Sequence, residues 1–175
     1  SVNCRVINAF IPVFWTHELG TSPEQGSFAL TVFFSIGIFM TYIGGLLGDK
    51  YGPIKIIRLS LLIWLPSMFL LTQVPEFSVT IMMPLAYLIL LMIGAAKAIS
   101  YSPVIVLGQT YLAKSIGFAS GITLGVSQTI GGIIAPVVGN LADTYSLPAA
   151  MMTLVPFLIV GLIASLLLKD PKKLQ

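Results

Sequence analysis

Charged residues are scarce in this sequence of 175 residues, at 9%, against 57% hydrophobic residues and a mean hydropathy of +0.99. A typical soluble domain carries about 25% charged residues. So few polar side chains do not cover a water-facing surface, which argues against a soluble enzyme or a nucleic-acid-binding module. The single cysteine, Cys4, and the single histidine, His17, exclude an internal disulfide and metal sites built from several Cys and His side chains.

Two further absences limit the chemistry of the chain. No G-x-x-x-x-G-K-[ST] segment occurs, so the chain has no phosphate-binding loop and no ATP-driven motor of its own. No Asp or Glu stands inside an apolar stretch, since all 6 acids lie in predicted loops or at helix ends. We therefore expect no enzyme, no bound cofactor and no metal site.

The apolar residues form long uncharged runs. A bilayer core of ~30 Å needs about 20 apolar residues per helix, so a chain of this length holds about six spans and no further domain. The first run is short and the chain begins at Ser1 without Met, so we expect the sequence to start inside a helix of a longer protein. The fold class predicted for 1–175 is all-α, an integral membrane six-helix bundle. Charges and turn residues place its helices at 4–19, 26–48, 54–74, 78–111, 116–141 and 147–168.

The stretch from Phe77 to Ala113 permits one long helix or two short ones, and the charges decide between them. Basic loops lie on the cytoplasmic side of a membrane. Six spans place every basic loop and the basic tail on one side and the acidic loops on the other, whereas seven spans move the tail to the acidic side. We predict six spans with a cytoplasmic C-terminus. The basic side then holds Lys50, Lys55, Arg58, Lys114, Lys169, Lys172 and Lys173, and the opposite side Glu18, Glu24, Glu76 and Asp143.

Two segments of the sequence resemble each other. Gly45-Leu-Leu-Gly-Asp-Lys-Tyr-Gly52 and Gly139-Asn-Leu-Ala-Asp-Thr-Tyr-Ser146 share Gly, Leu, Asp and Tyr at matching positions. Each closes the middle helix of a three-helix set, and the predicted topology places them on opposite sides of the membrane. Units of about 1–74 and 77–170 are therefore predicted to form an inverted three-plus-three repeat, the plan of many secondary transporters.

The first of these segments resembles a loop signature of the major facilitator superfamily, G-x-L-x-D-[RK]-x-G followed by basic residues. Pro53 and Ile54 stand where basic residues are common, and Lys55 and Arg58 supply the charge. The segments Phe10-Ile-Pro-Val-Phe-Trp15, 109–121 and 131–143 look like the fosmidomycin-resistance family within that superfamily. The resemblance covers the whole chain. It implies the C-terminal half, helices seven to twelve, of a twelve-helix transporter in the cell membrane, whose partners are the lipid bilayer, a small-molecule substrate and the missing N-terminal six-helix half.

Asp49 allows two interpretations that are compatible with each other. It is placed to cap the start of the third helix, where a carboxylate accepts backbone N–H bonds and suits the positive end of the helix dipole. The resemblance implies a conformational latch as well, in which the carboxylate holds the opposite half of the transporter in one access state. The predicted latch consists of Gly45, Asp49, Lys50, Gly52 and Lys55.

Lys97 is the only charge in the interior of an apolar helix, apart from Arg5 near the start of the chain. An ammonium in a membrane usually lines a cavity or pairs with another group, so an anionic substrate group or a carboxylate of the missing half would be its partner. The alternative is snorkelling, in which the long side chain reaches the membrane interface. Polar residues within spans usually make hydrogen bonds between helices. With Lys97, three of them are candidates for the substrate cavity: Asn8, Tyr101 and Gln128.

Gly117, Gly121 and Gly125 recur every four residues and form one stripe on the fifth helix. Small residues let membrane helices approach closely, so packing is the simplest interpretation, and a gating role would add to it. Gly132, Pro136 and Gly139 continue this small-residue tract.

The function that these patterns favour is transport of a small molecule by rocking of two six-helix halves around a site at the middle of the membrane. The resemblance implies proton-coupled drug efflux of the fosmidomycin-resistance type, driven by the proton gradient. An uptake permease for a small anion or metabolite in the same superfamily is one alternative. A membrane scaffold subunit that transports nothing is an alternative of another class.

Overall fold

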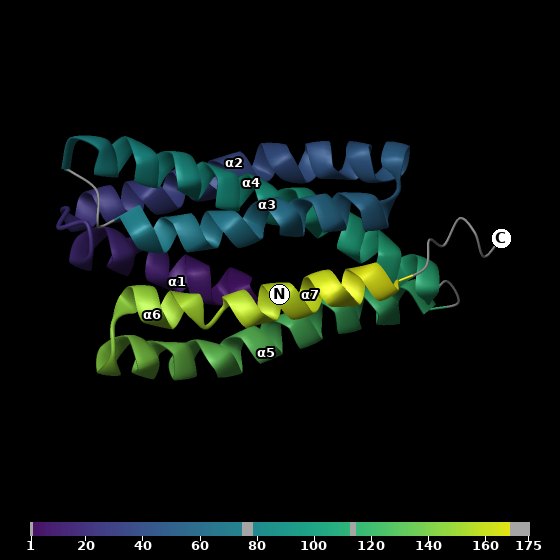
Figure 1. The fold of residues 1–175 in the computed structure, drawn as a ribbon. Coiled ribbons are helices and arrows are strands. Elements are labelled where there is room, and N and C mark those ends of the chain that lie inside the picture. The colour runs from purple at the N-terminus through teal and green to yellow at the C-terminus, as the bar shows by residue number, and fades with distance from the viewer. Residues whose placement is uncertain (1, 75–78, 113–114, 169–175) are drawn as a thin grey trace.

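The computed structural model of the chain describes residues 2–74, 79–112 and 115–168. These residues form helices joined by short turns, and the long helices lie side by side in one bundle (Figure 1). In order they are α1 (Val2–His17), α2 (Pro23–Tyr51), α3 (Pro53–Gln73), α4 (Val79–Tyr111), α5 (Ile116–Thr144), α6 (Leu147–Met152) and α7 (Val155–Leu167).

The all-α membrane fold is confirmed. Among the described residues, five segments are long and apolar enough to cross a membrane, with α6 and α7 together forming the last of them. Helix α1 has 16 residues, which at 1.5 Å per residue cover about 24 Å. Helix α4 runs without interruption for 33 residues, so the alternative of two short helices between Phe77 and Ala113 is wrong. Lys114, Glu76 and the tail from Lys169 lie outside the described residues.

Helix α2 is longer at both ends than the predicted 26–48. It begins at Pro23 because Ser22 accepts a hydrogen bond from the Gln25 N–H, and proline suits the first turn of a helix. At the other end it continues through Asp49 to Tyr51. Gly52 alone makes the turn to α3, with φ 94° and ψ 140°, a backbone region that favours glycine.

The predicted sixth helix, 147–168, is wrong as a single helix. It breaks between α6 and α7, where the Thr153 and Leu154 N–H groups bond to Ala150 and Met151, three residues back. Pro156 explains the break, since its ring has no N–H and collides with the carbonyl four residues before it. The two short helices still form one continuous span from Leu147 to Leu167.

The tightest contact of the bundle is the crossing of α2 and α4. A Cβ on Gly44 would lie 2.7 Å from Ile99 Cα, and a Cβ on Gly48 would lie 3.1 Å from Pro103 Cγ. A side chain at Gly44 has no room and one at Gly48 would require the Pro103 ring to shift, so the glycines bring the two backbones together. Near the far end of α1, Trp15 is fully buried and meets the Tyr87 ring edge-on, with 5.4 Å between ring centroids.

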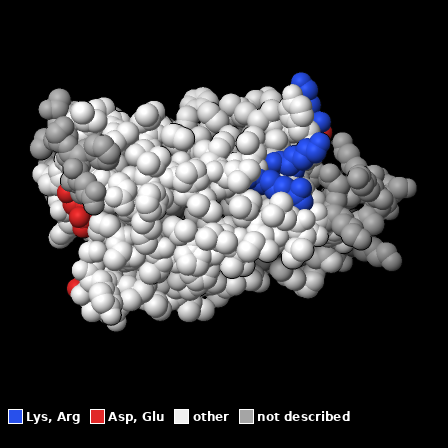
Figure 2. Space-filling view, in the orientation of Figure 1, with Lys and Arg blue, Asp and Glu red and all other residues white. Residues whose placement is uncertain are grey.

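Charges separate to the two ends of the bundle, as Figure 2 shows for the face in view. We call the end with Lys50, Lys55 and Arg58 the basic end, and the end with Glu18, Glu24 and Asp143 the acidic end. The α2–α3 turn lies at the basic end and the α5–α6 turn at the acidic end (Figure 1). The two similar segments therefore lie at opposite ends, as an inverted repeat requires, and their kinship stays a prediction.

Candidate functional site

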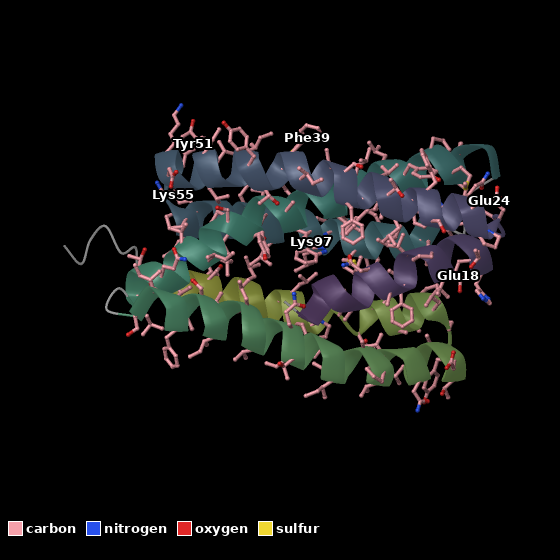
Figure 3. The ribbon with its side chains drawn as sticks, turned by 180° about the vertical axis from the view of Figure 1, so that it is seen from behind. Glu18, Glu24, Phe39, Tyr51, Lys55 and Lys97 are labelled. Atoms are coloured by element: carbon pink, nitrogen blue, oxygen red, sulfur yellow. The ribbon has the colours of Figure 1, made fainter. Side chains whose placement is uncertain are left out.

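Lys97 lies at the middle of the bundle. Along α4 it is about 27 Å from Val79 and about 21 Å from Tyr111, at 1.5 Å per residue. Figure 3 places it between Glu18 and Glu24 at one end and Tyr51 and Lys55 at the other. The side chain turns inward rather than toward an interface, so snorkelling does not describe it.

The Lys97 ammonium lies among three side chains from α1 and α2. It is 4.6 Å from the ring centroid of Phe33 and 5.7 Å from that of Phe34. It donates a hydrogen bond of 3.4 Å to Asn8 Oδ1, which is long for an N–H···O bond. Gly94 makes this arrangement possible, because a Cβ there would lie 3.1 Å from the Phe33 ring. The site is therefore built by a glycine one turn before the lysine.

Lys97 is partly buried, and these contacts compensate only part of the hydration that its ammonium loses. A desolvated cation–π contact contributes about 2 kcal/mol, while removing an ammonium from water costs several kcal/mol. Among the described residues no carboxylate pairs with Lys97, and Asn8 is its only hydrogen-bond acceptor. The site therefore holds a positive charge whose only hydrogen-bond partner among the described residues is neutral.

A cavity of about 290 Å³ opens beside Lys97 among α3, α4, α5 and α7. Its wall extends from Lys97 toward the basic end, as far as Ile105 on α4 and Ile57 on α3. Most of the wall is apolar, and Lys97 is its only charged residue. The polar side chains on it are Ser100, Tyr101, Thr123 and Gln128, with the indole of Trp64.

The structure brings the four predicted cavity residues together. Lys97, Tyr101 and Gln128 line the cavity, and Asn8 contacts the Lys97 ammonium from α1. Tyr101 is 50% exposed, so its ring forms an open edge of the cavity. Among the described residues no group of three or more Cys, His, Asp or Glu side chains is placed to hold a metal ion.

Two residues of the site were missed from the sequence. Phe33 is 1% exposed, and its ring lies against the ammonium. Trp64 is 3% exposed and lines the cavity, and its Nε1–H has no hydrogen-bond partner among the described residues. A buried aromatic residue on an apolar helix has no pattern that distinguishes a site residue from a core residue, so the sequence carried no signal for either.

The cap interpretation of Asp49 is wrong. Asp49 lies in the last turn of α2, and the residue at the N-cap of α3 is Gly52, which makes no side-chain cap bond. The exposed carboxylate makes no hydrogen bond or ion pair with any described residue. A negative charge at the C-terminal end of a helix opposes the helix dipole, so Asp49 does not stabilise α2.

The other predicted latch residues divide into two groups. Lys50 and Lys55 are exposed at the basic end, and the Lys50 ammonium lies 5.3 Å from the Tyr51 ring centroid. Gly45 and Gly52 have structural tasks: a Cβ on Gly45 would lie 3.3 Å from Ser102 Oγ, and Gly52 makes the α2–α3 turn. Three charges, on Asp49, Lys50 and Lys55, are thus free to meet a partner outside the described chain.

Arg58 has a role that the sequence did not indicate. Its guanidinium donates to the Ser165 carbonyl from Nε at 3.0 Å and from one terminal nitrogen at 2.7 Å, and also reaches Leu166 at 3.3 Å. These carbonyls end α7 and have no partner within the helix. Arg58 therefore ties the start of α3 to the end of α7.

The glycine stripe of α5 has no partner in the described chain. A Cβ added to Gly117, Gly121, Gly125 or Gly132 would meet nothing within 4 Å. A shallow open groove runs along this face, lined by Gly121 and Gly125 and by Phe118, Ile122 and Val126. Gly139 alone has a neighbour, with Phe10 Cζ at 3.8 Å, and Pro136 is exposed. Any helix that the stripe approaches lies outside the described residues, so its packing role stays a prediction.

The chain is similar to known membrane transporters. It is 32% identical over 151 residues to the uncharacterized MFS-type transporter YfnC of Bacillus subtilis (strain 168), a match that covers 86% of this chain and 35% of that protein. It is 28% identical over 146 residues to the fosmidomycin resistance protein of Escherichia coli (strain K12), covering 81% of this chain and 33% of that protein. The chain thus spans about a third of the length of these relatives. No solved structure matches it.

The predicted superfamily is confirmed by a match along the entire sequence. The helical bundle, the charge asymmetry of its ends and the match over residues 1–175 lead to one conclusion: the chain belongs to the Major Facilitator Superfamily of transporters.

Proposed function

We propose that this chain forms the C-terminal half of a secondary transporter that carries a small molecule across the cell membrane. Rocking of this bundle against an N-terminal six-helix half would open a site between them to each side of the membrane in turn. The observation that carries the proposal is the Lys97 ammonium, held at the middle of the bundle beside a cavity without a charged partner among the described residues. Ionisable groups at this depth mark substrate or ion pathways.

The free charges at the basic end support the proposed rocking of this bundle against the other half. Asp49 opposes the dipole of its own helix and has no partner in the described chain, so its contribution lies in a contact with the other half. A contact made in only one access state would act as the predicted latch. The basic end would face the cytoplasm, together with the C-terminus.

Proton-coupled drug efflux is the transport activity that we favour. It is supported by the similarity to the fosmidomycin resistance protein of Escherichia coli. Proton movement needs a titrating group in the membrane, and the described acids all lie at the ends of the bundle. The carboxylate that carries the proton would then belong to the other half. The uptake of a small anion is the second candidate, favoured by the positive charge of Lys97 beside the cavity.

Flux measurements on the complete transporter in proteoliposomes test this proposal. Flux of a labelled solute that accelerates with an imposed proton gradient, in the direction opposite to the protons, is the expected result for efflux. Flux in the same direction as the protons would favour the uptake permease. Absence of flux for every solute tested, in protein that is folded and inserted, would support the scaffold alternative. The 175-residue chain alone is expected to give no flux, because it forms only one wall of the pathway.

A further inference from the structure

We propose that the cavity beside Lys97 binds small molecules that combine one anionic group with a compact apolar body, and that the anionic group lies on the Lys97 ammonium. This inference names a substrate class and rests on the transport function proposed above. It depends on the charge at the cavity, on the chemistry of its wall and on its size.

The charge at the cavity is positive and has no counterion in the described chain. The nearest acids along α2 are Glu24, about 14 Å from Phe33, and Asp49, about 23 Å from Phe34, at 1.5 Å per residue. Glu24 stands at the acidic end (Figure 3), and Asp49 lies in the last turn of α2 at the basic end. Lys97 is partly buried in this chain, and a charge that leaves water needs a partner and hydrogen bonds. An anion in the cavity supplies the negative charge that Asn8 and Phe33 lack. The flexible four-carbon stem of lysine lets the ammonium turn toward this anion.

The rest of the wall indicates what else the ligand carries. On the side of the cavity toward the basic end, α3, α4 and α5 present Ile57, Leu61, Val104, Ile105 and Leu124, which suit an apolar or aromatic body. The Trp64 indole adds a flat apolar surface on the same wall. An inorganic anion or acetate would fill only the charged part and leave this apolar surface uncovered.

The cavity in this chain is small and suits a compact ligand group. Ligand sites usually enclose about 300–1,000 Å³, and this cavity, at about 290 Å³, lies at the lower limit. A single aromatic ring with one acidic group is of the right size. A cavity formed with the other half would enlarge the site around this pocket without changing the charge that the pocket presents.

Binding measurements with matched ligands test the proposal on the complete transporter in detergent. The probes are benzoate and phenylphosphonate, with benzamide as the neutral analogue, benzylamine as the cationic analogue and acetate as the anion without an apolar body. We expect benzoate and phenylphosphonate to bind roughly tenfold or more tightly than benzamide, benzylamine and acetate, because a hydrogen bond to a charged group is worth about that factor.

Lys97→Met keeps the length of the side chain and removes its charge. We expect it to lose at least about tenfold in affinity for benzoate and to leave the affinity for benzamide nearly unchanged. Lys97→Arg should keep most of the preference for anions. Lys172→Met removes a positive charge from the chain after the last helix and should change neither affinity. Val104→Trp, which fills the cavity, should weaken benzoate and benzamide alike.

Several results would overturn the inference. They are equal binding of benzoate by the parent and Lys97→Met, a preference of the parent for benzamide or benzylamine, and no binding of any probe. Equal binding of benzoate by the parent and Lys97→Met is expected if a carboxylate of the other half neutralises Lys97. Flux of solutes that does not depend on Lys97 or on an anionic group would leave the proposed transport intact and remove this inference. Lys97-dependent binding of benzoate without any flux would support the site and contradict the transport function.

Discussion

Helices α2 and α5, which the predicted repeat relates to each other, carry similar small residues in different surroundings. In α2, Gly44 and Gly48 lie directly against Ile99 and Pro103 of α4. In α5, Gly117, Gly121 and Gly125 face open space in the described chain. A row of small residues therefore indicates that a helix can be approached closely, but does not reveal which helix approaches it. The glycine face of α2 is packed against α4 within this chain, whereas the glycine face of α5 meets no described helix.

Gly44→Ala should give the largest effect, and it tests the close crossing of α2 and α4. The added Cβ overlaps the Ile99 backbone, which cannot move as a flexible side chain would. Overpacking usually costs about 1–3 kcal/mol, and we expect the upper part of that range or complete loss of the folded protein. Thermal unfolding in detergent measures the effect. Gly37→Ala is the control on the same helix, since a Cβ there meets nothing within 4 Å; equal stability of the two variants would contradict the close crossing.

Asp49→Asn compares the two helices at their C-terminal ends. It removes the charge from α2 at nearly constant size, and we expect slower transport and a shift between access states. A coupling of about 1–3 kcal/mol changes the balance of states by roughly 5–150-fold. Cysteine accessibility on the two sides of the membrane, measured with flux, reports both effects. Asp143→Asn, at the end of α5, should do less because it has no adjacent lysine. Parental flux and accessibility in Asp49→Asn would exclude the latch.

Arg58→Met tests whether the last span is held in place by α3. The variant removes the donors to the carbonyls at the end of α7, which are partly open to solvent, so we expect a loss of about 1 kcal/mol. Faster hydrogen exchange of the Leu168 amide, which bonds to Ala164, would show local opening of that end. Lys55→Met removes a neighbouring exposed charge and should leave this exchange rate unchanged. The same rate in Arg58→Met and the parent would mean that the contact stabilises nothing.

Gly121→Ala should have the smallest effect on stability, and it tests the exposed glycine stripe of α5. The bundle should keep its stability or gain up to ~1 kcal/mol from the better helix propensity of alanine. If the stripe meets the other half, flux through the complete transporter should fall while the stability of the bundle does not. A drop in the unfolding temperature comparable to that of Gly44→Ala would show that α5 packs within this chain in a way that the structure lacks.

The sequence was sufficient to locate the long helices, because charged and turn residues separate them. It was insufficient where the outcome depends on contacts in three dimensions. Gly52 and Pro53 indicated a turn, but not that α2 continues to Tyr51 and leaves Asp49 inside its last turn. Pro156 was visible in the sequence, yet its effect on the last span was not predicted, since prolines also stand inside the unbroken α4.

The candidate site was predictable to the extent that polarity made its residues conspicuous. Asn8, Lys97, Tyr101 and Gln128 stand out among apolar neighbours, and the structure places them around one cavity or against its lysine. Phe33 and Trp64 have the polarity of ordinary core residues, so only their positions reveal them. Arg58 was assigned to the basic loop by its charge, and its contacts with α7, more than one hundred residues later, needed the fold.

Transport by Lys97 variants of the complete transporter tests the central claim, that the charge beside the cavity takes part in transport. Initial flux rates in proteoliposomes, at equal amounts of inserted protein, are compared for the parent, Lys97→Arg and Lys97→Met. We predict that Lys97→Met lowers kcat/KM by roughly tenfold or more, the value of one hydrogen bond to a charged group, while Lys97→Arg retains part of the activity. A parental rate in Lys97→Met would contradict the claim and leave Lys97 only a structural role in the bundle.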